Sequence, residues 1–209
     1  MGVPAEDGSI TTVLFDYGEV ISVPPPPEVR SALERLSGAT AEDFWAAYWA
    51  ERRPYDAGLS SAEYWDRVAA RIGADWDAAR RQELWATDVG GWLYAFPPSV
   101  ALIHRLADRG VRLALLSNAP SDIAGALRAS PLLERFDALF FSCDLGMCKP
   151  DPEVYHRVLA DLDADPAEVA FIDDREENVL AAKRIGIDAH HFGGITDLES
   201  FLIDRIGTF

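Results

Sequence analysis

Residues 11–21 (TTVLFDYGEVI) form a short apolar run, rich in β-branched and aromatic side chains, that predicts a buried strand. Four consecutive prolines, Pro24 to Pro27, end it because proline can neither continue a strand nor sit inside a helix. Residues 28–93 then carry helical periodicity, and the next strand pattern starts at residue 111. A helical insert of about 70 residues, the size of a small subdomain, therefore separates the first strand from the others.

The second half of the chain alternates strand and helix patterns. Strands are expected at 111–118, 138–145, 169–174 and 188–192, with helices at 121–129, 152–162 and 177–187 and a further helix at the C-terminus. Such alternation predicts a parallel sheet with helices on both faces. We predict an α/β, Rossmann-like core, residues 1–21 and 96–209, and a small all-helical cap, residues 22–95, inserted after the first strand.

The sequence has a formal net charge of −16 at pH 7, which repels phosphodiester backbones and anionic lipid. We therefore expect no nucleic-acid partner and no membrane partner. The two cysteines, Cys143 and Cys148, are too few for a disulfide framework and lack the partners of a zinc site. No apolar run reaches membrane-spanning length, and residues 1–10 lack the regions of a signal peptide. These features predict a soluble, cytoplasmic protein.

Polar side chains follow the expected strands of the core, near the point where each strand ends. In open parallel sheets, ligands bind in the crevice outside the carboxyl ends of the strands. Three carboxylates, a hydroxyl, an amide and an ammonium should therefore meet in one crevice. They belong to Asp16, Ser117, Asn118, Lys149, Asp173 and Asp174.

This set of groups suits phosphoryl transfer. A carboxylate can attack phosphorus and form an acyl phosphate, which divides hydrolysis into two easier steps. Carboxylate and phosphate repel each other, so a hard cation has to offset their charge, and clustered carboxylates are the oxygen ligands that Mg²⁺ prefers. A lysine neutralises further charge on the transferring group, and a serine hydroxyl donates to a phosphate oxygen.

Four segments resemble, in order, the four motifs of the haloacid dehalogenase-like (HAD) hydrolase superfamily. They are FDYGEV around Asp16, LLSNA around Ser117, GMCKPDPEVY with Lys149, and FIDDREENVLAAKRIGI around Asp173 and Asp174. The resemblance covers residues 11–21 and 97–192, and the joint occurrence of the motifs makes it specific. The helical insert matches the small cap that closes over the site in this superfamily.

The resemblance implies a role for each of these residues. Asp16 is the expected nucleophile, and Ser117 is the phosphate-binding hydroxyl, with Asn118 beside it in the substrate site. Lys149 neutralises the phosphate and orients Asp16. The cofactor is Mg²⁺, and its implied ligands are Asp16, the backbone carbonyl of Gly18, Asp174 and, directly or through water, Asp173.

The first motif departs from the pattern of most phosphatases in the superfamily. They read Asp-x-Asp, and the second aspartate is the general acid that protonates the leaving group, whereas Gly18 takes that position here. Asp-x-Gly-x-Val resembles instead a sugar-phosphate phosphatase branch related to α-D-glucose-1-phosphate phosphatases. We expect a site that lacks the acid, with Glu19 as the alternative donor. The implied substrate is a small phosphorylated metabolite, with a sugar phosphate as a candidate.

Within the helical insert, residues 52–61 (RRPYDAGLSS) resemble the cap loop that faces the site in relatives. Arg53, Tyr55 and Asp56 are therefore candidates for substrate contact. All six tryptophans lie in the insert, where helical spacing favours a role in its hydrophobic core over stacking on a substrate. In the core, two interpretations of Asn178 stay open, a tether for its loop and a solvated helix position.

Three other functions compete with a phosphatase. A 2-haloacid dehalogenase uses the same aspartate without metal, but a site for a carboxylate substrate should not gather extra anions such as Asp173 and Asp174. Phosphonate cleavage through a lysine imine needs a lysine in the cap, and the insert has none. A binding protein that has lost turnover is supported only by Gly18, and the retention of Asp16 and Lys149 argues against it.

Overall fold

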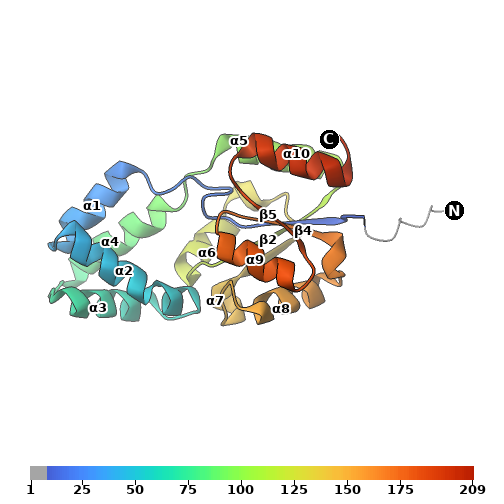
Figure 1. Ribbon diagram of the computed structural model, residues 1–209. Helices are drawn as coiled ribbons and strands as arrows, with labels where there is room; N and C mark the ends of the chain where they lie inside the picture. The colour runs from blue at the N-terminus through green and yellow to red at the C-terminus, as the bar shows by residue number, and fades with distance from the viewer. Residues whose placement is uncertain (1–8) are drawn as a thin grey trace.

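The computed structural model describes residues 9–209 and builds them around one parallel sheet (Figure 1). Within this range the sheet has five strands in the order β3-β2-β1-β4-β5, which puts β1 at the centre. Their bounds are Thr12–Phe15 (β1), Arg112–Ser117 (β2), Ala138–Phe141 (β3), Val169–Asp173 (β4) and Asp188–His191 (β5). The predicted α/β, Rossmann-like sheet is confirmed, and residues 1–8 of the expected core lie outside the described range.

Helices cover both faces of the sheet, because successive side chains of a buried strand point to opposite faces. In β1, Val13 and Phe15 join the hydrophobic cluster of one face, and Leu14 joins that of the other. The first cluster draws on α5 (Pro97–Asp108), α6 (Ser121–Arg128) and α10 (Ile195–Ile206), and the second on α8 (Pro152–Leu162) and α9 (Glu176–Arg184). Short helical segments are Pro131–Leu133 (η1), Ser142–Leu145 (α7) and Pro166–Glu168 (η2).

Four further helices of the described chain form a unit beside the sheet (Figure 1). They are α1 (Pro27–Ser37), α2 (Ala41–Asp56), α3 (Ser61–Ile72) and α4 (Ala78–Gly91). These helices share an aromatic-rich hydrophobic cluster that is separate from the two clusters of the sheet. Polar side chains cap three of their starts: Thr40 accepts from the backbone N–H of Asp43, Asp77 accepts from that of Arg80, and Ser60 forms a capping box with Glu63.

Two segments that lie side by side join the helical unit to the sheet. Ser22 and Ala95 form an isolated antiparallel bridge, and the backbone N–H of Phe96 donates to the carbonyl of Ile21 at 2.7 Å. We propose this bridge as the boundary of the cap, residues 22–95, since the chain enters and leaves the helical unit here.

The structure differs from the predicted elements in two places. The sequence predicts a strand over 138–145, but β3 ends at Phe141 and the next four residues form the helical turn α7. Periodicity alone cannot separate strand from helix in so short an apolar run. Helix α5 is also absent from the predicted elements. It starts with Pro97 and Pro98, which are interpreted from the sequence only as the end of the helical insert, but proline is tolerated in the first turn of a helix. None of the helices in residues 9–209 is long and apolar enough to span a membrane.

Candidate active site

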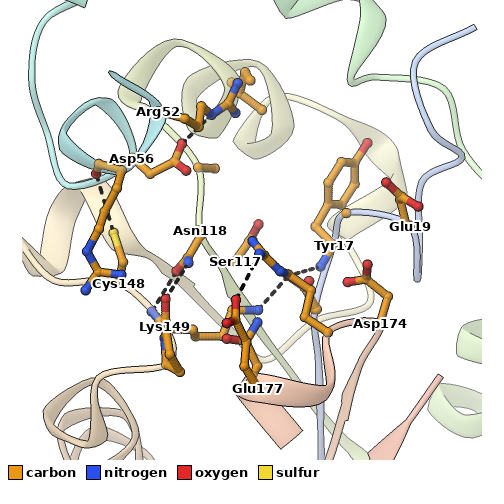
Figure 2. A pocket seen from close by; sticks show the side chains of 18 of the residues that line it. Tyr17, Glu19, Arg52, Asp56, Ser117, Asn118, Cys148, Lys149, Asp174 and Glu177 are labelled. Atoms are coloured by element: carbon orange, nitrogen blue, oxygen red, sulfur yellow. Dashed lines mark hydrogen bonds and ion pairs between the residues drawn. The ribbon is translucent and has the colours of Figure 1, made fainter. Parts of the chain in front are cut away.

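A pocket of about 560 Å³ lies between the carboxyl ends of the strands and the helical cap (Figure 2). Five of the six side chains expected at the strand ends line it, and the sixth, Asp173, is buried and contacts Lys149. The core contributes Asp16, Gly18, Ser117, Asn118, Lys149 and Asp174 to its lining, and the cap contributes Trp49, Arg52, Arg53 and Asp56.

Lys149 is the centre of the charged groups in the pocket. Its side chain is 1% exposed, and its ammonium lies 2.8 Å from Asp16 Oδ1 and 2.7 Å from Asp173 Oδ2. It also donates to the carbonyl of Leu116 at 2.9 Å. Asn118 fixes the lysine backbone, since its side-chain amide donates to the Lys149 carbonyl and accepts from the Lys149 N–H, both at 2.9 Å. Asn118 therefore positions the lysine as well as lining the pocket.

Asp173 is fully buried, and protein donors surround its carboxylate. Besides Lys149, it accepts from the backbone N–H of Arg175 at 2.8 Å and from the Asn178 side-chain amide at 2.9 Å. Asn178 is 2% exposed, so it tethers the loop and is not a solvated helix position. The sequence could have decided between these two interpretations, because Asn178 lies in the first turn of the helix that follows Asp173 and Asp174.

The acidic groups repel one another at close range. Asp16, Asp173 and Asp174 each offer a carboxylate oxygen, and these oxygens all lie within 4.8 Å of one another. Burial raises the pKa of Asp16 to about 7, although the Lys149 ammonium acts to lower it. Burial also raises the pKa of Asp174 to about 6, with repulsion from Asp173 and Glu19 adding to the effect. One lysine does not neutralise three carboxylates.

This donor set fits a magnesium ion. Clustered carboxylate oxygens with excess negative charge are the ligands that Mg²⁺ prefers. Asp16, Gly18 and Asp174 line the pocket and would hold the ion directly. Asp173 already accepts hydrogen bonds from Lys149 and Asn178, which suits it better to contact through water.

Ser117, Gly18 and Glu19 complete the core side of the pocket. Ser117 is 3% exposed, ends β2 and lines the pocket. A Cβ on Gly18 would lie 3.9 Å from the nearest atom of Trp92, so the space there admits a side chain. Glu19 adopts a left-handed conformation (φ 55°), uncommon for a residue with a side chain, and lies on the same side of the pocket as Asp174 (Figure 2).

The cap residues chosen from the sequence have different surroundings. Arg53 is 57% exposed and forms an ion pair with Asp151 of the core at 2.7 Å. Tyr55 is buried, donates its hydroxyl to Asp122 of the core at 2.6 Å, and does not line the pocket. The structure therefore makes Tyr55 a contact between cap and core, whereas Arg53 lines the pocket as well. Asp56 lines the pocket, and its contact with a substrate stays a prediction.

Sequence reasoning missed Arg52 and two tryptophans of the pocket. Arg52 is buried, and its Nε donates to Asp56 Oδ1 at 2.8 Å. Trp49 and Trp92 line the pocket, so these two tryptophans are not simply core residues of the cap. The sequence does contain a pattern that could have identified Arg52. Tyr48, Arg52 and Asp56 are four residues apart, which puts the arginine and the aspartate on one helix face.

The chain thus has a Rossmann-like parallel sheet that carries a helical cap after its first strand, with an aspartate, a lysine and an acidic pair near the junction of sheet and cap. A sequence model of the haloacid dehalogenase-like hydrolases matches residues 10–186. The chain belongs to this family.

Individual relatives are similar over parts of the chain. The sesquiterpene phosphatase astK of Aspergillus oryzae is 37% identical over 92 residues, 44% of this chain and 47% of that protein. The (S)-2-haloacid dehalogenase 1 of a Pseudomonas strain is 33% identical over 110 residues, 52% of this chain and 48% of that protein. The chain thus spans about half the length of these curated relatives.

A solved structure shares the fold. It is a HAD family enzyme from Bacteroides thetaiotaomicron in complex with magnesium and inorganic phosphate. The two chains superpose with a TM-score of 0.68 at 19% identity, over 87% of this chain and 93% of that one.

Proposed function

We propose that the protein is a magnesium-dependent phosphatase that hydrolyses a small phosphate monoester through an aspartyl phosphate on Asp16. The observation that carries the proposal is the convergence of Asp16, Lys149 and Asp174 in one capped pocket. Support also comes from the similarity to a phosphatase and from the magnesium and phosphate in the Bacteroides enzyme.

Asp16 supplies the nucleophile in this proposal. Its Oδ1 lies 2.8 Å from the Lys149 ammonium and accepts from the Tyr17 N–H at 2.7 Å, whereas Oδ2 has no protein partner in residues 9–209. Oδ2 attacks phosphorus, the bond to the leaving oxygen breaks with its electron pair, and an acyl phosphate forms on Asp16. Water then attacks this intermediate, which releases inorganic phosphate and restores the carboxylate.

Other residues of the pocket bind the transferring group and the ion. The Lys149 ammonium neutralises negative charge on the phosphoryl oxygens, and the Ser117 hydroxyl donates to one of them. Asp16, Asp174 and the Gly18 carbonyl would hold magnesium. When bound, the ion offsets the repulsion between the nucleophile and the phosphate. The cap covers these groups and limits the access of bulk water.

Dehalogenation of a 2-haloacid is the second candidate, and the similarity to the Pseudomonas enzyme favours it. Its substrate is a carboxylate and its reaction needs no metal. The carboxylates of Asp16, Asp173 and Asp174 within 4.8 Å of one another disfavour such an anion, because no cation besides Lys149 contacts them among the described residues.

The test measures phosphate release from a panel of small phosphate monoesters, with Mg²⁺ and with a chelator. We expect turnover that depends on Mg²⁺ in the wild type and none in Asp16→Asn, since an amide cannot form the acyl phosphate. Asp66→Asn, an exposed carboxylate of the cap, is the matched control. Chloride release from 2-chloropropionate in chelator would instead establish the dehalogenase. Binding of phosphate esters without any turnover would establish a non-catalytic protein.

A further inference from the structure

The cap side of the pocket carries a charged pair that the proposed chemistry does not use. Arg52 and Asp56 lie one helical turn apart on α2, each is 8% exposed, and both line the pocket. The Arg52 Nε donates to Asp56 Oδ1 at 2.8 Å. Figure 2 shows the pair on the opposite side of the pocket from Ser117 and Lys149. A phosphate held by the core would therefore direct the rest of the substrate toward Arg52 and Asp56.

A network behind the pair fixes its orientation. The Nη1 of Arg52 donates to the Tyr48 hydroxyl at 2.6 Å, and that hydroxyl donates to Asp88 at 2.7 Å. The guanidinium also lies over the Trp92 ring, 5.3 Å from its centroid. Because these contacts already restrict the arginine, little side-chain freedom is lost when a ligand binds.

One donor and one acceptor of the pair remain for a ligand. Arg52 Nη2 and Asp56 Oδ2 have no hydrogen-bond partner within residues 9–209. Both atoms are accessible to solvent, since neither is among the buried side-chain nitrogen and oxygen atoms of this range that lack a hydrogen-bond partner. Since both residues line the pocket, these two atoms are available to a molecule inside it.

The charge of the network disfavours an anion as that ligand. The Arg52 cation faces two carboxylates, Asp56 on one side and Asp88, whose Oδ2 lies 3.9 Å from Nη1, on the other. A carboxylate or a second phosphate would be repelled by Asp56. The other arginines of the pocket, Arg53 and Arg175, already pair with Asp151 and Glu177. A hydroxyl fits both free atoms, because it can accept from an N–H and donate to a carboxylate at the same time.

Two aromatic rings flank the same space. Trp49 is 54% exposed, and both Trp49 and Trp92 line the pocket. Their indole rings offer apolar surface to the carbon skeleton of a hydroxylated ring. A wholly apolar group would instead remove water from Arg52 and Asp56 without replacing its hydrogen bonds, which is unfavourable.

We propose that Arg52 and Asp56 form the specificity site for the leaving group and bind a hydroxyl of a polyol, such as a sugar or cyclitol ring. The inference rests on the proposed phosphatase function and names its substrate class. It separates this chain from a phosphatase of an apolar substrate, such as the sesquiterpene phosphatase to which it is similar.

The test compares Asp56→Asn with the wild type on two kinds of phosphate monoester. Asparagine keeps an oxygen for Arg52 Nε but puts an N–H where the free acceptor was. We expect kcat/KM to fall about 10- to 100-fold for hexose and cyclitol monophosphates, and less than about 3-fold for phenyl phosphate, which has no hydroxyl to bind. Arg52→Lys should discriminate in the same direction. Asp66→Asn and Arg67→Lys, both on exposed positions of α3, are matched controls that should change neither rate.

Two results would overturn the inference. One is a kcat/KM that changes by a similar factor for polyol phosphates and for phenyl phosphate, or does not change for either, in both Asp56→Asn and Arg52→Lys. The other is a wild-type preference for farnesyl phosphate over every polyol phosphate. Circular dichroism checks that each variant is folded, and if one is not, the other decides. A wild type that hydrolyses no ester at all, phenyl phosphate included, would refute the phosphatase proposal itself, so the two failures are distinguishable.

Discussion

Replacing Lys149 with methionine should destabilise the protein as well as inactivate it. The lysine ammonium lies 2.8 Å from Asp16 and 2.7 Å from Asp173, and the side chain is 1% exposed. Methionine has a similar length but no charge, so the variant would bury two carboxylates without a counter-charge. Removing one partner of a buried ion pair costs about 3–5 kcal/mol. Because single domains are stable by about 5–15 kcal/mol, this is a large part of the total.

The assay is urea unfolding at pH 7.5 in chelator, followed by circular dichroism so that the core contributes to the signal. Lys183→Met is the matched control, since Lys183 is the other lysine of the sequence and is exposed on α9. It should change the free energy of unfolding by less than about 1 kcal/mol.

The loss in Lys149→Met should be smaller at pH 5 than at pH 7.5. Burial raises the pKa of Asp16 to about 7 even with the lysine in place. A carboxyl group whose pKa is raised by folding binds protons more readily in the folded state, so lowering the pH through that pKa stabilises the folded state. A free energy of unfolding within about 1 kcal/mol of the wild type at pH 7.5 would refute this account of the buried charges. A loss that is the same at both pH values would show that packing, and not charge, is responsible.

Three further predictions concern the metal, the leaving group and the cap. Asp174→Ala should weaken magnesium binding and raise the Mg²⁺ concentration needed for half-maximal activity, measured by titration; unchanged metal dependence would remove Asp174 from the ligand set. Without an acid at Gly18, rates over a series of monoesters should fall steeply with leaving-group pKa in the wild type and in Glu19→Gln. There is space for an aspartate beside Trp92, and Gly18→Asp should raise the rates for the poorest leaving groups by up to about 10²–10⁴-fold, which makes the dependence on leaving-group pKa shallower. A shallow wild-type series that becomes steep in Glu19→Gln would identify Glu19 as the acid. Finally, a metal fluoride that mimics phosphate should slow hydrogen exchange in the cap loop and at the non-proline positions of the two junctions, residues 22–23 and 94–96, as expected if the cap closes there. Unchanged exchange would count against a hinge.

The core of the site could be predicted because its residues follow strands that are visible in the local pattern. The run ending at Phe15 is apolar and β-branched, so Asp16 is recognisable as the residue at its carboxyl end. The same holds for Ser117 and Asp173, and parallel strands bring their carboxyl ends to one edge. Lys149 lies in a loop, and only the motif around it indicated its role.

Local patterns predicted the cap as a helical unit but not which side chains it turns toward the core. Thr40 and Ser60 mark helix starts through contacts three residues away, which the sequence shows directly. By contrast, Tyr55 donates to Asp122, 67 residues further on, and Arg53 pairs with Asp151, 98 residues further on. Contacts between residues so far apart along the chain cannot be predicted from the local hydrophobic period.

The sequence by itself determined the order of the elements, the parallel sheet and the identity of the groups at its carboxyl edge, since hydrophobic period and strand ends are local properties. Tertiary structure alone decided that Asn178 is a buried tether, that Tyr55 does not line the pocket, and that Arg52 and Trp92 do. The physical reason is that burial and pairing of these polar groups depend on how the cap packs against the core. That packing brings together residues that are far apart along the chain.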